Sequence, residues 1–293
     1  MHALSAVPRL SLAPRELSLR LPHLTLAALA WGSPQLPPLL AVHGWLDNAA
    51  SFNALAPLLA DRFHVVAIDW PGHGRSQHRP AGAWYHYVDY ADELHGAALA
   101  LGWERFGLLG HSLGGAVASV FAATQPERVE RLWLIESLGP LSADPTQALE
   151  HLRRAYGQRQ GFREKSLRVF ASVDEAVAAR QAANGLSEGA ARVLVERGLT
   201  EVPGGWSWSS DPRLTLASPL RFSEIQIRAA LRGIQAPGVL VLAEPETSYL
   251  PRATMDARAA CVPSLRVLRL SGNHHLHLEN AQAVAQALLT AAD

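Results

Sequence analysis

The sequence lacks most of the features that would set it apart from an ordinary globular protein. Cysteine occurs once, as Cys261, so no disulfide can form within the chain, which is typical of a reducing compartment. Charged residues make up 18% of the chain and sum to a formal net charge of zero. This balance gives no indication of nucleic acid or of an acidic membrane surface as a partner.

Long apolar segments are also missing. The longest apolar runs are far too short to span a membrane, and the first residues lack the basic and then unbroken apolar pattern of a signal peptide. We therefore expect a cytoplasmic protein without a membrane span, as a monomer or a homodimer. Its 293 residues, 48% of them hydrophobic, suit one large domain with an insertion or two smaller domains.

Short apolar runs bounded by turn residues recur along the chain. Such runs suit parallel strands that are covered on both faces, and helical patterns lie between them. The alternation predicts an α/β fold with a doubly wound sheet, preceded by an antiparallel edge hairpin at 17–21 and 24–31. The predicted buried strands lie at 39–42, 64–68, 106–109, 132–135, 239–242 and 265–268, and the helices at 53–60, 90–101, 115–124 and 281–291.

The rhythm of strands and helices breaks for about a hundred residues after residue 135. The segments 146–170, 173–184 and 187–197 look helical and amphipathic. Because the α/β pattern resumes afterwards, we interpret 138–233 as a mostly helical lid inserted into a core domain formed by 1–137 and 234–293. A second independent domain is the alternative.

The predicted strand at 106–109 runs into Gly110-His111-Ser112-Leu113-Gly114, and a helix-compatible stretch follows. A strand, a Gly-x-Ser-x-Gly turn and a helix force the serine into a sharp elbow with its hydroxyl exposed above the sheet. The motif alone arises by chance in roughly one protein in ten of this size. Its flanking segments therefore carry the inference that Ser112 is a nucleophile for acyl transfer.

A nucleophilic serine needs a base, and three histidines follow the last predicted strand. His274 lies in the loop that starts at Gly272, at the carboxyl end of that strand, where catalytic groups of α/β sheets gather. His275 and His277 compete with it, but we favour a surface or helix-capping role for both. A metal site is the other possibility for clustered histidines, and no second group of ligands stands at a suitable spacing.

A triad also needs a carboxylate that orients the imidazole, and here the residues leave alternatives. Glu136 ends the predicted strand 132–135, and a charge set on a buried strand end needs a partner. Glu244 and Glu246 follow the strand 239–242 and compete with it.

Two loops complete the predicted site. Gly44 turns the chain after the strand 39–42, which would aim the Trp45 N–H at the site as one oxyanion donor. The Leu113 N–H, at a helix N-terminus just after Ser112, would be the second. The loop 69–76 is rich in turn formers, but its glycines do not precede a helix as in a phosphate loop, so we reject nucleotide binding.

These motifs, in this order, resemble those of the α/β-hydrolase-fold serine hydrolases. The similarity runs from about residue 15 to the C-terminus and is loose in the lid. Within that superfamily the chain is similar to the serine hydrolase-like proteins. The stretches that carry this closer similarity are His-Gly-Trp-Leu-Asp-Asn at 43–48, Ile-Glu-Ser-Leu-Gly-Pro at 135–140 and Trp-Ser-Ser-Asp-Pro-Arg-Leu at 208–214.

The resemblance implies an eight-stranded, mostly parallel sheet with helices on both faces, a catalytic order of serine, acid and histidine, and no cofactor. His274 matches the catalytic histidine of the family. Most members place an aspartate after the seventh strand, and this chain has none there. Some relatives take the acid from the end of the sixth strand, so the resemblance favours Glu136 first and Glu246 second.

The predicted activity is hydrolysis of a carboxylic ester or related acyl substrate. We expect a small, apolar acyl molecule bound between sheet and lid, because large aromatic side chains stand at suitable places. Hydrolysis of a carbon–carbon bond or acyl transfer on the same triad is one alternative, and a non-catalytic small-molecule receptor is another. The predicted pocket residues are Trp45, His111, Trp70, Trp206 and Trp208.

Overall fold

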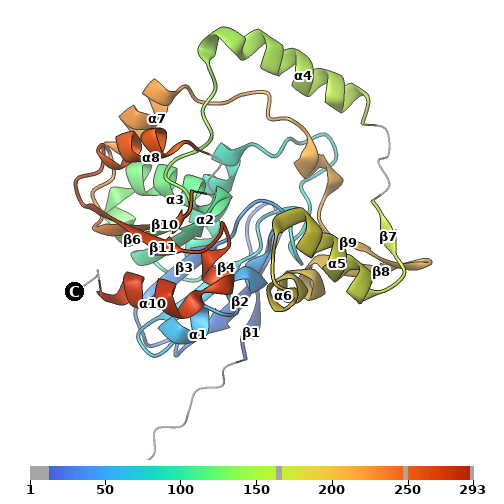
Figure 1. The fold of residues 1–293 in the computed structure, drawn as a ribbon, viewed down its shortest axis with the longest axis horizontal. Coiled ribbons are helices and arrows are strands. Elements are labelled where there is room, and N and C mark those ends of the chain that lie inside the picture. Colours follow the sequence, from blue (N-terminus) through green and yellow to red (C-terminus); the bar gives the residue numbers. More distant parts are fainter. Residues whose placement is uncertain (1–12, 163–166, 247–249, 291–293) are drawn as a thin grey trace, which may run out of the picture.

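A computed structural model describes residues 13–162, 167–246 and 250–290 and contains a central eight-stranded sheet (Figure 1). Its strand order is β1-β2-β4-β3-β5-β6-β10-β11; β2 pairs antiparallel with β1 and β4, and the other pairs are parallel. The predicted fold class and edge hairpin are confirmed. The strands are β1 (Arg15–Arg20), β2 (Thr25–Trp31), β3 (Pro38–Val42), β4 (His64–Ile68), β5 (Phe106–His111), β6 (Val129–Ile135), β10 (Gly238–Glu244) and β11 (Leu265–Ser271).

Helices cover both faces of this sheet (Figure 1). Alternate strand residues enter two hydrophobic cores, so Leu40 of β3 packs on the side of α2 and α3, whereas Leu39 packs on the side of α1 and α10. The nearly unbroken apolar strands follow from this double coverage. The helices of the core are α1 (Ala56–Leu59), α2 (Tyr87–Ala100), α3 (Leu113–Thr124), α8 (Arg252–Ala259), α9 (Leu276–Glu279) and α10 (Ala281–Thr290), with short 3₁₀ turns η1 (Ala49–Phe52) and η2 (Pro126–Arg128).

The chain between β6 and β10 contains helices at 173–184 and 188–198, close to two of the predicted places. The helix predicted at 146–170 covers only 148–160, because 169–170 form a strand; residues 163–166 of that prediction lie outside the described residues. Ser172 and Ser187 start the first two of these helices, because each side chain accepts a hydrogen bond from the third backbone N–H of its helix. A three-stranded sheet, which the sequence did not lead us to expect, follows in the same region. The elements are η3 (Pro145–Gln147), α4 (Ala148–Gln160), β7 (Val169–Phe170), α5 (Val173–Asn184), α6 (Glu188–Gly198), β8 (Leu199–Val202), β9 (Gly205–Trp208), η4 (Pro212–Thr215) and α7 (Glu224–Leu231).

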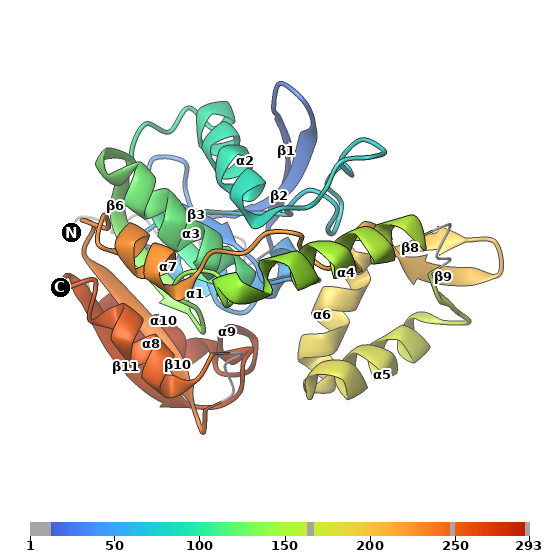
Figure 2. The ribbon, with the colours of Figure 1, turned by 90° about the horizontal axis from the view of Figure 1, so that it is seen from above.

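These elements divide into two groups. Helices α5 and α6 and the small sheet β7-β9-β8 enclose a hydrophobic core of their own, and α4 stretches between this unit and the main sheet (Figure 2). Helix α7 lies within the predicted range 138–233, but its buried Ile227 and Leu231 belong to the core between the sheet, α2 and α3. Among the described helices, none is long and apolar enough to cross a membrane.

The parallel strands bring distant loops together. Since β3, β5, β6 and β11 all point the same way, the loops after them meet at one edge of the sheet. Those four loops hold the predicted oxyanion segment, the serine elbow, Glu136 and His274.

Candidate active site

Ser112 occupies a strained elbow between β5 and α3. Its φ is 49° and its ψ is −114°, a conformation that L-residues rarely adopt. The two glycines of the motif allow the chain to fold back tightly. A Cβ on Gly110 would stand 2.6 Å from the Gly114 carbonyl oxygen, and one on Gly114 would stand 2.0 Å from the Val42 carbonyl oxygen. These spacings explain why glycine stands on both sides of the serine.

His274 and Glu136 form a pair at the same edge. The Nδ1 atom of His274 lies 3.1 Å from Oε2 of Glu136. Because a carboxylate only accepts, this contact favours the imidazole tautomer that carries its proton on Nδ1 and has its acceptor lone pair on Nε2. Glu136 is 4% exposed, and its second oxygen accepts a hydrogen bond of 2.5 Å from the Ala243 N–H. Each carboxylate oxygen of Glu136 thus contacts a group that holds it in place, His274 on one side and the Ala243 N–H on the other.

Glu246, the second predicted acid, makes different contacts. Its Oε1 accepts a hydrogen bond of 2.5 Å from the Arg252 N–H, and its Oε2 lies 4.0 Å from the guanidinium of the same arginine. The carboxylate is also largely exposed, with 42% of the side chain open to solvent. Glu244, the third candidate, also pairs with Arg252, at 3.2 Å. Of these three glutamates, Glu136 is the one whose contact with His274 the structure describes.

The two predicted oxyanion donors both border the cavity that contains Ser112. Leu113 is the first residue of α3, so its N–H has no acceptor within the helix. Trp45 lies in the loop after β3, next to Leu46, whose φ is 59°. The indole N–H of Trp45 donates to the Leu214 carbonyl at 3.1 Å, so this loop is also tied to the chain that precedes α7.

A cavity of about 780 Å³ joins these groups. Its volume lies within the range of small-molecule sites in proteins. The lining includes Ser112, His274, Glu136, Trp45 and Leu113, together with residues of α4, α5 and the segment 214–221. The insertion between β6 and β10 thus supplies much of the wall opposite the sheet.

Three of the predicted pocket residues do not line this cavity. Trp70 is fully buried, its ring packs against Tyr90, and its indole N–H donates to the His43 carbonyl. Trp206 and Trp208 lie on one face of β9 and pack into the core of the small sheet, where Trp208 meets Phe170 edge-on. That part of the prediction was wrong. Trp45 and His111 do line the cavity.

The histidines near the site are buried, which the sequence did not lead us to expect. His275 and His277, predicted as surface or capping residues, are 5% and 0% exposed. His275 lies 3.4 Å from the Asp47 carboxylate, and Nε2 of His277 lies 2.5 Å from the Ser51 hydroxyl. His111 holds the loop of His274, because its Nε2–H donates to the His274 carbonyl at 2.9 Å. Burial lowers the pKa of His111 to about 4, so it is neutral at neutral pH.

Asp47, which sequence reasoning missed, carries the negative charge of this cluster. Burial opposes its ionisation, but His275 and Arg180 hold the pKa of its carboxyl well below the usual range. Arg180 comes from α5 and forms an ion pair with Asp47. This pair links the insertion directly to the loop that contains Trp45.

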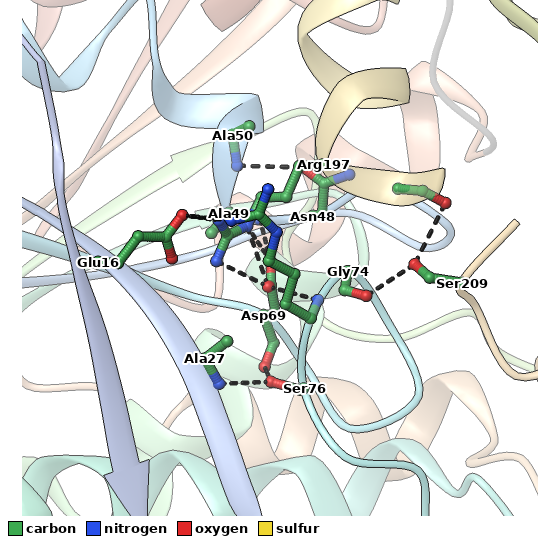
Figure 3. Close-up of polar contacts among 12 residues, drawn as sticks. Glu16, Ala27, Asn48, Ala49, Ala50, Asp69, Gly74, Ser76, Arg197 and Ser209 are labelled. Carbon is green, nitrogen blue, oxygen red and sulfur yellow. Dashed lines mark hydrogen bonds and ion pairs between the residues drawn. The ribbon is translucent and has the colours of Figure 1, made fainter. Parts of the chain in front are cut away.

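A second buried ion pair anchors α6 to the core (Figure 3). Asp69, at the end of β4, is fully buried, and Arg197 of α6 contacts both of its oxygens, at 3.1 and 3.0 Å. Arg197 also donates to Glu16 at 2.8 Å, and Ser209 donates to the Gly74 carbonyl at 2.7 Å (Figure 3). The sequence carries a signal for this contact, because Arg197 falls on the apolar face of α6.

The comparisons with known proteins agree with this architecture. The family described as alpha/beta hydrolase fold matches residues 37–189. A serine hydrolase-like protein of Danio rerio is 33% identical over 94% of this chain and 87% of its own length.

Two solved structures extend the comparison. A hypothetical protein of Pseudomonas aeruginosa PAO1 is 43% identical, with a TM-score of 0.88 over 96% of this chain and 99% of that chain. A thioesterase domain from the curacin biosynthetic pathway is 27% identical, with a TM-score of 0.81 over 94% of this chain and 99% of that chain. The chain therefore belongs to the α/β-hydrolase fold family, among the serine hydrolase-like proteins.

Proposed function

We propose that this hydrolase cleaves a carboxylic ester or thioester through a triad of Ser112, His274 and Glu136 and a covalent acyl-enzyme. One observation carries the proposal: the His274–Glu136 pair, at 3.1 Å, borders the same cavity as a serine held in a strained elbow. A base oriented by a third group beside a strained nucleophile is the arrangement that acyl transfer requires.

Acylation uses the Nε2 lone pair of His274 as the base. Nε2 accepts the Ser112 proton while the hydroxyl oxygen attacks the carbonyl carbon, and the Glu136 carboxylate stabilises the imidazolium that forms. The Trp45 and Leu113 N–H groups donate to the oxyanion. Collapse of the tetrahedral intermediate expels the alcohol or thiol, which takes its proton from Nε2 and leaves the acyl group on Ser112.

Deacylation repeats these roles with water. His274 removes a proton from water as it attacks the acyl-enzyme, and the second tetrahedral intermediate collapses to the free acid. The Ser112 oxygen recovers its proton from the imidazolium. The reaction therefore consumes one water for each ester bond and needs only groups that border the cavity.

Two findings support an acyl substrate with an ester or thioester bond. The cavity of about 780 Å³ gives an acyl chain room beside Ser112. The thioesterase domain from the curacin pathway, at 27% identity, extends the proposed substrates to thioesters.

Hydrolysis of two uncharged substrates tests the proposal: p-nitrophenyl hexanoate and the hexanoyl thioester of N-acetylcysteamine. We expect Ser112→Ala to lower kcat by about 10³-fold or more, because residual catalysis would come from binding and the oxyanion donors alone. Water enriched in ¹⁸O should place its label in the acid product of the wild-type reaction. Nearly full activity in a folded Ser112→Ala variant, judged by circular dichroism, would refute the scheme.

A further inference from the structure

Two arginines of the insertion border the active-site cavity and have no acidic partner among the described residues. Arg154 of α4 and Arg221, in the segment before α7, are both exposed lining residues. Within the described ranges neither guanidinium takes part in a hydrogen bond or an ion pair. Arg180, another arginine of the described lining, differs from them because it is paired with Asp47.

The carboxylates of the lining do not balance these charges. Asp47 and Glu136 are the acidic residues of the described cavity wall. Asp47 contacts Arg180 and His275, and Glu136 contacts His274 and the Ala243 N–H. In a chain whose formal net charge is zero, the described part of the cavity wall thus holds a local excess of positive charge.

The two arginines belong to neighbouring segments. His151, Arg154 and Gln158 follow one another at helical spacing on α4, and all three line the cavity. The Gln158 side chain accepts a hydrogen bond of 2.7 Å from the Ala217 N–H. This contact ties the cavity-facing side of α4 to the segment that leads to Arg221.

Two tyrosine hydroxyls on α2 add unused donors to the same cavity. Tyr87 and Tyr90 both line it, and in the described part of the chain neither buried hydroxyl has a hydrogen-bond partner. Tyr90 is only 2% exposed. The Tyr87 ring meets the ring of Phe222 edge-on at 5.5 Å, which places it beside the neighbour of Arg221. Burial raises the pKa of both tyrosines, so the hydroxyls keep their protons.

We propose that the substrate of this hydrolase carries an anionic group, a carboxylate or a phosphate, which Arg154 and Arg221 bind in the cavity. Guanidinium groups match both anions in shape and stay charged at all relevant pH values, and the tyrosine hydroxyls can donate further hydrogen bonds. The inference rests on the proposed acyl hydrolysis and narrows its substrates to charged esters or thioesters.

Two matched substrate pairs test this subsite and separate the two sources of charge. Mono-p-nitrophenyl adipate and p-nitrophenyl hexanoate differ in a carboxylate at the end of the acyl chain. S-hexanoyl-4′-phosphopantetheine and S-hexanoylpantetheine differ in the phosphate of the leaving group. For each pair the quantity measured is the ratio of kcat/KM for the charged member to that for the neutral member.

We expect a ratio well above one for at least one pair, and a fall of that ratio by about threefold to tenfold in Arg154→Gln or Arg221→Gln. Arg153→Gln is the matched control, since it removes the same charge from an exposed arginine of α4 that is not in the cavity lining. Absence of a preference in both pairs, or a preference that Arg154→Gln and Arg221→Gln leave unchanged, would overturn the proposal.

Binding to Ser112→Ala keeps this question separate from the chemistry. Equilibrium dissociation constants of the adipate and hexanoate esters can be measured on that variant without turnover. Tighter binding of the adipate ester that is weakened by Arg221→Gln would support the subsite even if hydrolysis failed. Equal binding of both esters, together with hydrolysis of the neutral ester by wild type, would refute the subsite and leave the proposed function intact.

Discussion

Strained backbone marks the site at the scale of single residues. In the described part of the chain, the non-glycine residues with positive φ are Leu46, Ser112 and Glu136. All three line the cavity, and each such conformation costs about 1–3 kcal/mol. They come from three separate loops, so their coincidence at one cavity indicates that the fold positions these loops for a function.

For single residues, the prediction concerns Glu136. In Glu136→Gln the carbonyl oxygen can still accept from Ala243, but the amide nitrogen would donate toward Nδ1 of His274 and favour the wrong tautomer. We expect kcat/KM for p-nitrophenyl hexanoate to fall by about 10²- to 10⁴-fold. Glu246→Gln is the matched control, because its carboxylate contacts Arg252, and a larger loss in that variant would contradict the assignment.

The sequence was informative for individual residues where their chemistry depends on local motifs. Glycines that cannot carry a Cβ pointed to Ser112, and a charge at a strand end pointed to Glu136. The sequence did not show which side chains are buried by residues that lie far away along the chain. Trp70 carries the same sequence signal as a pocket tryptophan but packs against Tyr90 in the core. Likewise, the residues next to His277 in the sequence do not indicate that its imidazole contacts the Ser51 hydroxyl.

At the scale of elements, the apolar strands were predictable and the insertion was predictable in part. Strands β3 and β4 contain continuous runs of buried apolar residues. The prediction of a buried strand at 265–268 was wrong, because β11 lies at the edge of the sheet, includes Arg266 and Arg269, and has no fully buried residue. In the insertion, β8 continues directly from α6 and β9 holds only four residues. Short strands that bury little area leave a weak pattern, because their pairing depends on partners elsewhere in the chain. The placement of α7 against α3 likewise depends on tertiary packing.

The ion pair that attaches α6 to the main sheet leads to a prediction about stability. Arg197→Met would leave the fully buried Asp69 carboxylate without its cation, and we expect a loss of about 3–5 kcal/mol in the free energy of unfolding. Arg192→Met, on the same helix, removes two exposed ion pairs, with Asp174 and Glu188, and should lower the free energy of unfolding far less. Urea denaturation measures both values, and equal losses would contradict the anchoring role of Arg197.

At the scale of the whole molecule, buried neutral histidines couple stability to pH. His43 and His73 are fully buried, and His111 is 1% exposed. Burial lowers the pKa of His43 and His111 to about 4 and that of His73 to about 3. The geometry of His43 requires the neutral form, because its Nδ1–H donates to the Gly44 carbonyl while its Nε2 accepts from the backbone N–H of Trp70.

The sign of this effect follows from proton uptake on unfolding. Between the unfolded pKa of about 6.5 and the folded pKa of about 4, an unfolded histidine binds a proton that the folded one excludes. We therefore expect stability to fall as the pH drops through that window, by about 1.4 kcal/mol per pH unit for each such histidine. Urea denaturation at a series of pH values should show a slope that decreases in His43→Asn, whereas an unchanged slope would contradict this origin.

The most direct test of the central claim is whether Ser112 is an activated nucleophile, and intact mass after treatment with a fluorophosphonate probe measures this without knowledge of the substrate. We predict one adduct per wild-type chain and none in Ser112→Ala. Ser137→Ala, which removes another serine that borders the cavity, should still be labelled at Ser112. Absence of labelling in folded wild-type protein, or equal labelling of Ser112→Ala, would contradict the account.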